Sequence, residues 1–149
     1  MTLEQIQSMW KEDSVIDQID LDKASLQTPS LHAKYLELLN EKRLSLKSYE
    51  VKYNKLLKTK WMWYTDKLDK EEIDALGWDY DPFHGHNKPL KSDYSYYFNA
   101  DEDLSNLKLK VEYLTECVDA LKEILNIITW RHQSIKNAID WLKFTNPAG

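Results

Sequence analysis

The stretch Leu104–Leu142, LSNLKLKVEYLTECVDALKEILNIITWRHQSIKNAIDWL, decides the fold. Steps of three and four alternate along it through twelve positions, of which eleven are apolar. The eleven are Leu104, Leu107, Val111, Leu114, Val118, Leu121, Leu125, Ile128, Ile135, Ile139 and Leu142. This period predicts a long helix in a coiled coil or bundle, over residues 99–146 with Asn99 at its cap. We expect the stripe to build an oligomer, and His132, the twelfth position, to fix its register.

A second long helix is predicted over residues 28–70. Thr28 and Pro29 form a start signal, because Thr caps helices and Pro fits the first helical position. Apolar residues and lysines then recur at helical spacing as far as Trp63. At 1.5 Å per residue such a helix would be roughly 57 Å long, too long for a local element of a small globule. The sequence therefore predicts an all-α fold, an elongated hairpin of two long helices.

Shorter segments complete the predicted single domain, 1–149. Thr2 and Gln5 can form a capping box for a short helix in an N-terminal arm, residues 1–27. Residues 71–98 are expected to form a long ordered loop, since Gly and Pro break the period and many aromatic rings are costly to leave in water.

Composition narrows the class of protein. The chain carries 20 Lys+Arg against 25 Asp+Glu, a net charge of -5. Cys117 is the only cysteine, which excludes an intramolecular disulfide and indicates a small buried residue in a reducing compartment. Because the N-terminus does not resemble a secretory signal and no apolar run approaches about 20 residues, we expect a soluble intracellular protein.

Positive charge is nevertheless concentrated in residues 42–60. This segment holds seven basic residues and one acid, Glu50, so that it carries +6 (seven minus one), and aromatic residues follow it. Cations that follow phosphates beside rings that stack on unpaired bases are typical of single-stranded nucleic-acid binding. A solvated helix face followed by core aromatics is the alternative. The candidate contact residues are Arg43, Lys47, Lys52, Lys55, Lys58, Lys60, Trp61, Trp63 and Tyr64.

A helical wheel separates these lysines. Lys47, Lys55 and Lys58 fall opposite the apolar stripe and should face solvent. Lys60 falls inside the stripe, roughly 160° from Lys58 at 100° per residue. We therefore expect either a helix break near Thr59 or a subunit interface at which another chain completes a groove around Lys60.

Enzyme signatures are missing. The sequence has no phosphate-binding loop, no dinucleotide glycine pattern and no Gly-x-Ser-x-Gly elbow. His84 and His86, with Asp79 and Asp81 nearby, have ligand types that suit divalent metals, but their spacing matches no specific site. A hydrogen-bonded loop or a pH-sensitive surface is the favoured interpretation, and we expect neither an enzyme nor a metal or cofactor.

Several segments resemble the UvsY family, the recombination mediators of T-even-like phages. Leu3–Ile6 and Trp10–Asp17 are similar to the N-terminal region of the family. Leu57–Lys60, followed by Tyr64, resembles its Lys-Ala-Arg-Leu segment and the tyrosines after it. Phe98–Asp101 resembles the start of its C-terminal helical part. The resemblance is spread over most of the chain.

This resemblance implies a non-enzymatic protein that binds single-stranded DNA as a ring-like hexamer or heptamer. It implies two protein partners in the host cell cytoplasm: a single-strand-binding protein that is destabilised on DNA, and a UvsX-like phage recombinase that is loaded. The arginine of the family is Lys60 here, which loses bidentate phosphate geometry, and its leucine is Trp61, which adds a ring. Two alternatives stay open, a structural coiled-coil scaffold and a small metal-dependent enzyme using His84 and His86.

Overall fold

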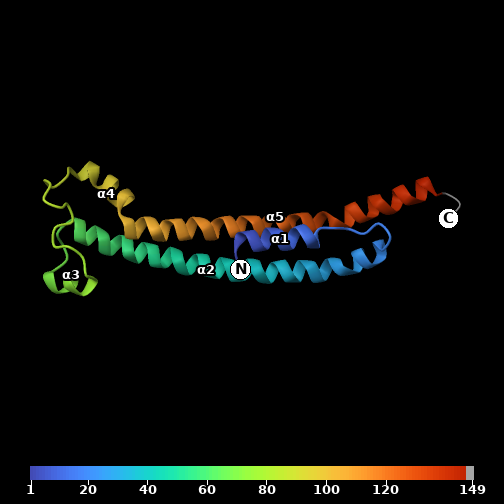
Figure 1. Ribbon diagram of the computed structural model, residues 1–149, viewed down its shortest axis with the longest axis horizontal. Coiled ribbons are helices and arrows are strands. Elements are labelled where there is room, and N and C mark those ends of the chain that lie inside the picture. The colour runs from blue at the N-terminus through green and yellow to red at the C-terminus, as the bar shows by residue number, and fades with distance from the viewer. Residues whose placement is uncertain (147–149) are drawn as a thin grey trace. The chain divides into compact units, whose positions relative to one another are not determined.

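The computed structural model describes residues 1–146, which contain helices and no β-strand. Five α-helices and one 3-10 turn follow each other in this range (Figure 1): α1 (Leu3–Asp13), α2 (Leu21–Tyr64), α3 (Lys70–Leu76), η1 (Lys91–Asp93), α4 (Tyr94–Ala100) and α5 (Glu102–Thr145). The predicted all-α class, the two long helices and the short N-terminal helix are confirmed. None of the described helices is long and apolar enough to cross a membrane.

The chain forms two compact units. The first unit comprises Met1–Ser45 and the described residues from Tyr113 onward, and the second comprises Leu46–Glu112. Helices α2 and α5 each contribute residues to both units.

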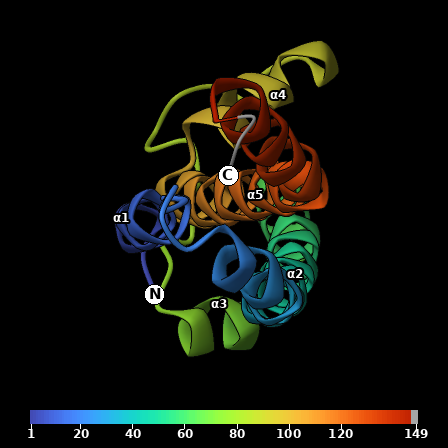
Figure 2. The ribbon, with the colours of Figure 1, turned by 90° about the vertical axis from the view of Figure 1, so that its right-hand side faces the viewer.

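In the first unit, α1 lies beside α2 and α5 (Figures 1 and 2). The predicted capping box is present, because Thr2 Oγ1 accepts the Gln5 N–H at 3.1 Å and Gln5 Oε1 accepts the Thr2 N–H at 2.8 Å. Asp13, the last residue of α1, accepts from Lys34 Nζ at 2.6 Å and from the Tyr35 hydroxyl at 2.8 Å. Hydrogen bonds at its C-terminal end therefore attach α1 to α2.

Helix α2 begins before its expected start. It runs from Leu21, so Thr28 and Pro29 lie inside the helix rather than at its cap. Leu21 and Ala24 are buried in an apolar cluster with Ile135 of α5. This packing stabilises a helical segment on the N-terminal side of Pro29, which local sequence signals alone would have excluded.

Helix α2 ends at Tyr64, earlier than predicted, in a Schellman-type stop. The Lys67 N–H bonds to the Met62 carbonyl at 2.7 Å, and the Asp66 N–H bonds to the Trp63 carbonyl at 3.4 Å. Asp66 has a φ of 60°, the left-handed conformation that closes such a motif.

Two short helices lie where residues 71–98 were expected to form a loop. Asp69 caps α3 by accepting the Glu72 N–H at 2.9 Å, and Gly77 ends it with a φ of 69°. Turn η1 leads directly into α4. Short helical elements therefore occupy both ends of the segment that was expected to be a long ordered loop.

Aromatic rings form the core of the second unit. Trp63, Tyr64, Ile73 and Phe83 are buried together. Partly buried side chains surround them, namely Leu68, Trp78, Tyr94, Tyr97 and Phe98. Burial of this apolar surface orders a segment that contains little regular secondary structure.

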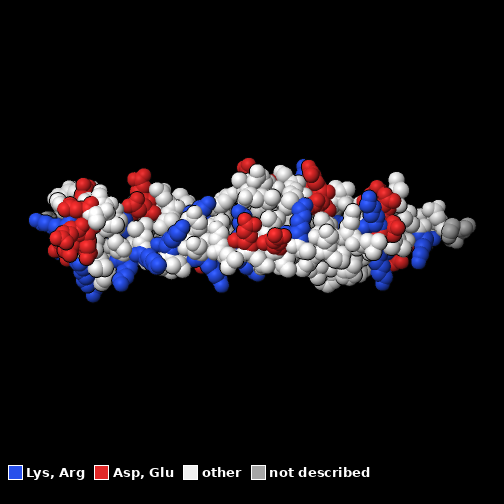
Figure 3. All heavy atoms as spheres, turned by 90° about the horizontal axis from the view of Figure 1, so that it is seen from below, with Lys and Arg blue, Asp and Glu red and all other residues white. Residues whose placement is uncertain are grey.

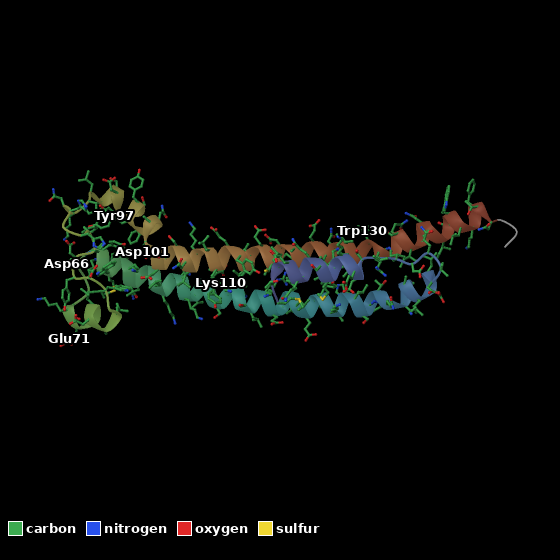
Figure 4. The ribbon with its side chains drawn as sticks, viewed as in Figure 1. Asp66, Glu71, Tyr97, Asp101, Lys110 and Trp130 are labelled. Atoms are coloured by element: carbon green, nitrogen blue, oxygen red, sulfur yellow. The ribbon has the colours of Figure 1, made fainter. Side chains whose placement is uncertain are left out.

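Asp101, not Asn99, caps α5. Its Oδ1 accepts the Leu104 N–H at 3.0 Å and its carbonyl accepts the Ser105 N–H at 2.9 Å. Asn99 belongs to α4, and the extended backbone of Asp101 separates α4 from α5 (Figure 4). The helix ends at Thr145, and Pro147 of the expected stop signal lies outside the described residues.

The inward face of α5 keeps a heptad spacing, but other residues than predicted occupy its alternate positions. Leu121, Ile128 and Ile135 are buried as predicted, but the positions between them shift by one residue. Arg131 is buried while His132 is exposed, so His132 does not occupy the core. The buried positions Leu114, Cys117, Leu121, Ile124, Ile128, Arg131 and Ile135 still follow steps of three and four, so the seven-residue repeat is kept.

The stripe that was expected to build the oligomer lies largely inside the single chain. Six of its eleven members are buried: Leu104, Leu114, Val118, Leu121, Ile128 and Ile135. Leu107, Val111 and Leu125 are half-buried, while Ile139 and Leu142 are exposed. The six buried members are covered by their own chain, so only the half-buried and exposed members remain available for association.

Candidate nucleic-acid interface on helix α2

Three lysines of α2 face solvent in the second unit. Lys47, Lys55 and Lys58 are exposed, as the helical wheel predicted. Within residues 1–146, none of the three forms an ion pair with a carboxylate. Their charges are therefore available to an external anion.

Lys60 has a different environment. Its side chain is 4% exposed, and its Nζ lies 3.0 Å from Asp101 Oδ2 and 2.9 Å from Asp103 Oδ2. The same ammonium lies 4.6 Å from the ring centroid of Trp63 and 4.0 Å from that of Trp78. Carboxylates and indole faces both stabilise a buried cation.

This arrangement corrects both expectations for Lys60. Helix α2 continues through Thr59 to Tyr64, so the helix does not break there. The groove around Lys60 is completed by the start of α5 of its own chain rather than by another subunit. Lys60 is consequently not accessible to a phosphate in this conformation.

Asp101 is the acceptor at the centre of this network. Burial raises the pKa of its carboxyl, but the Leu104 N–H, the Tyr64 hydroxyl at 2.8 Å and Lys60 lower it, and the net effect is a pKa below the ordinary value of 3.8. Burial and the bond to Asp101 raise the pKa of the Tyr64 hydroxyl, which therefore stays neutral and donates. The carboxylate is thus held ionised beside Lys60.

Trp63 and Tyr64 are core residues. They are 9% and 6% exposed, and the Trp63 Nε1–H donates to the Asp79 carbonyl at 2.8 Å. A ring must be accessible to stack on a base. Neither ring meets this condition, so the core interpretation of these two aromatics is the one the structure supports.

Of the three predicted aromatic contact residues, Trp61 is the one whose ring is accessible. It is 42% exposed and lines an open groove of about 470 Å³ together with Asn54, Leu57, Lys58 and Phe98. Lys67 Nζ lies 4.1 Å from the centroid of the Trp61 ring. Lys67 was not among the predicted contact residues, because it lies beyond the end of α2. Its position six residues after Trp61 was the one feature of the sequence that placed a cation near this ring.

The two remaining candidates do not line this groove. Arg43 is exposed and belongs to the first unit. Lys52 is also exposed, with its Nζ 4.6 Å from the ring centroid of Tyr49, and Lys110 of α5 lies 5.4 Å from the same ring.

Negative charge in the second unit is concentrated on α3. Asp69, Glu71, Glu72 and Asp74 lie on or next to this short helix, and Figure 3 shows acidic side chains gathered there. Like charges repel a polyanion, so a nucleic acid would avoid α3 and approach the lysines of α2.

Hydrogen bonds organise the histidine loop. Asp81 accepts the Phe83 N–H at 2.9 Å and the Gly85 N–H at 2.6 Å, and His84 has a φ of 50°. In the part of the chain that the structure describes, no three His, Cys, Asp or Glu side chains come together as a set of metal ligands. The geometry matches the favoured interpretation of a hydrogen-bonded loop.

Comparisons with known proteins identify what this arrangement resembles. A family model described as "Recombination, repair and ssDNA binding protein UvsY" matches residues 9–148. Among solved structures, a crystal structure of the bacteriophage T4 recombination mediator protein UvsY (lattice type II) is similar with a TM-score of 0.84 and 23% identity. The similarity covers 100% of this chain and 99% of that one.

A second crystal form of the T4 protein (lattice type IV) is similar with a TM-score of 0.79 and 20% identity over 97% of this chain and 99% of that one. A third (lattice type I) gives a TM-score of 0.77 and 19% identity over 95% and 98%. At this level of identity the likeness is one of fold. None of the curated proteins matches the chain by sequence.

Proposed function

The chain belongs to the UvsY family of recombination, repair and single-stranded DNA binding proteins, and we propose that it acts as a recombination mediator. In this role it binds single-stranded DNA and promotes the loading of a UvsX-like recombinase onto DNA covered by single-strand-binding protein. The observation that carries the proposal is the set of exposed, unpaired lysines on α2, Lys47, Lys55 and Lys58. Recombinase loading would take place in the host cell cytoplasm.

Phosphate binding by these lysines follows from simple electrostatics. Each lysine that neutralises a phosphate releases a condensed counterion, so affinity falls as salt rises. Arg43 and Lys52, both exposed, supply further positive charge along α2. Lys60 is assigned no DNA contact, because it is paired with Asp101 and Asp103.

Assembly into a ring-like hexamer or heptamer is the second part of the proposal. The net charge of one chain is -5, which opposes binding of a polyanion by a single subunit. Several copies on one strand would multiply weak contacts through a high effective concentration. Large apolar side chains exposed near the end of α5, among them Trp141 and Phe144, support association.

The experiment compares two triple variants that lose the same charge. Lys47, Lys55 and Lys58 are changed to Ala in one variant, and the exposed lysines Lys23, Lys122 and Lys136 are changed to Ala in the control. Binding to an unstructured oligothymidine is measured by fluorescence anisotropy over a range of salt concentrations.

We expect the α2 variant to lose about tenfold or more in affinity and its salt slope to fall by about 2, since each single-strand contact contributes about 0.7. The control should change much less. Equal loss in both variants would contradict the assignment of the lysines. If the native protein binds no oligonucleotide at any salt, the structural coiled-coil scaffold becomes the better account.

A further inference from the structure

The groove beside Trp61 has one wall on α2 and one on α4. Asn54, Leu57, Lys58 and Trp61 are spaced at i, i+3, i+4 and i+7, so they share one face of α2. Phe98 of α4 supplies the opposite wall, and the groove between them has a volume of about 470 Å³. Its lining is apolar except for the ends of Asn54 and Lys58.

The wall formed by Phe98 is fixed by the aromatic core. The Phe98 ring packs edge-on against Tyr64, with 5.4 Å between centroids, and also contacts Tyr94. Tyr64 is held by its hydrogen bond to Asp101. A rigid apolar wall opposite an exposed indole forms a preorganised slot for a flat ring.

Positive charge flanks this slot. Lys58 lines the groove, and Lys67 Nζ lies 4.1 Å from the Trp61 ring centroid. An apolar side chain of a protein partner would gain nothing from these two cations. In a DNA strand, the sugar that holds each nucleobase has a phosphate on either side, so a nucleotide matches both the slot and the cations that flank it.

We propose that the groove of Trp61, Leu57 and Phe98 binds an unpaired nucleobase of single-stranded DNA. Trp61 stacks on the base with the ring face opposite to the one that the Lys67 ammonium covers, and Lys58 and Lys67 contact the adjacent phosphates. The inference rests on the proposed DNA-binding function. It adds a contact to the base, made by Trp61, to the contacts that the lysines of α2 make with phosphates. It also separates Trp61 from Trp63 and Tyr64, which are buried in the core.

The test distinguishes the contribution of the bases to binding from that of the phosphates. Fluorescence anisotropy measures binding of an oligothymidine and of an abasic deoxyribose-phosphate oligomer of the same length, each with the native protein, Trp61→Ala and Trp61→Phe. The control is Tyr96→Ala, which removes an exposed ring outside the groove. Urea denaturation of every variant shows whether its fold is retained.

We expect the native protein to prefer oligothymidine about tenfold, which corresponds to one stacked base. Trp61→Ala should lose this preference and keep its affinity for the abasic oligomer, whereas Trp61→Phe and Tyr96→Ala should keep most of it. Equal native affinity for both oligomers, or an unchanged preference in Trp61→Ala, would overturn the nucleobase site and leave phosphate binding intact. Binding of neither oligomer would overturn both proposals.

Discussion

At the scale of the residue, Asp101 accepts from three donors at once. They are the Leu104 N–H, the Tyr64 hydroxyl and the Lys60 ammonium. Burying a carboxylate is costly unless such donors stabilise its ionised form. Because Lys60 and Asp101 are both buried, removal of either charge leaves the other buried without a charged partner that it contacts.

Replacement Asp101→Asn should therefore lower the free energy of unfolding at pH 7 by about 3 kcal/mol. The folded-state pKa of Asp101 lies below its ordinary value of 3.8. A depressed carboxyl pKa contributes stability that is present above the unfolded pKa and is lost as pH falls through the folded pKa. The difference between native protein and variant should thus be constant above about pH 5 and shrink below about pH 4.

Urea denaturation at a series of pH values and one protein concentration measures this difference. Asp79→Asn is the matched control, because Asp79 is exposed, and it should change stability by less than about 0.5 kcal/mol. A difference between native protein and Asp101→Asn that stays constant down to pH 2 would show that the Asp101 charge does not contribute.

At the scale of the element, Pro29 is the least expected feature of α2. It is the ninth residue of the helix and offers no N–H to the Ser25 carbonyl one turn earlier. Packing of Leu21 and Ala24 against Ile135 compensates for this local cost.

Pro29→Ala should raise the free energy of unfolding by about 2 kcal/mol. In a helix interior Pro costs about 3 kcal/mol relative to Ala, and the freer unfolded chain of the variant removes up to about 1 kcal/mol of the gain. Thermal and urea denaturation measure the change, with Ser30→Ala as a control that should gain much less. A destabilised Pro29→Ala would mean that the proline ring makes packing contacts worth more than the missing hydrogen bond.

The sequence predicts best those helices in which buried residues recur at a regular spacing. Apolar residues at steps of three and four predicted α5 almost to its ends, because each turn of the helix buries a residue on the same face. Helix α3 buries only Ile73, so it has no period, although Asp69, Glu72 and Gly77 mark its two ends.

The sequence predicts only those features of the candidate site that depend on residues close together along the chain. Exposure of Lys47, Lys55 and Lys58 follows from the helical wheel, which depends on neighbours along one helix. The environment of Lys60 depends on Asp101, distant in sequence, and no local pattern indicates that contact. The different burial of Trp61 and Trp63 also depends on the fold, because Trp63 packs in a core with Ile73 and Phe83.

At the scale of the whole molecule, apolar side chains remain exposed at the C-terminal end of α5. Trp130 is 61% exposed, Trp141 64% and Phe144 77%, and Trp141 and Phe144 stack on each other (Figure 4 labels Trp130). Proteins seldom leave such a group of rings in water unless a partner covers it.

If the proposed oligomer forms through these rings, the double variant Trp141→Ala plus Phe144→Ala should reduce its mass. The expected result in light scattering is a shift to smaller species at the same protein concentration, since the apolar area that drives association is removed. Leu90→Ala, which removes an exposed apolar side chain before η1, should leave the mass unchanged. If the double variant keeps the native mass, another surface holds the subunits together.

The buried thiol of Cys117 makes site-specific labelling simple. It is the only cysteine of the chain and its side chain is 0% exposed. Thiol reagents require an accessible thiolate, so Cys117 is shielded from them in the folded protein. A variant such as Lys47→Cys would then carry one reactive thiol on the surface of α2, where a fluorophore or spin label can report on that helix without any other change to the chain.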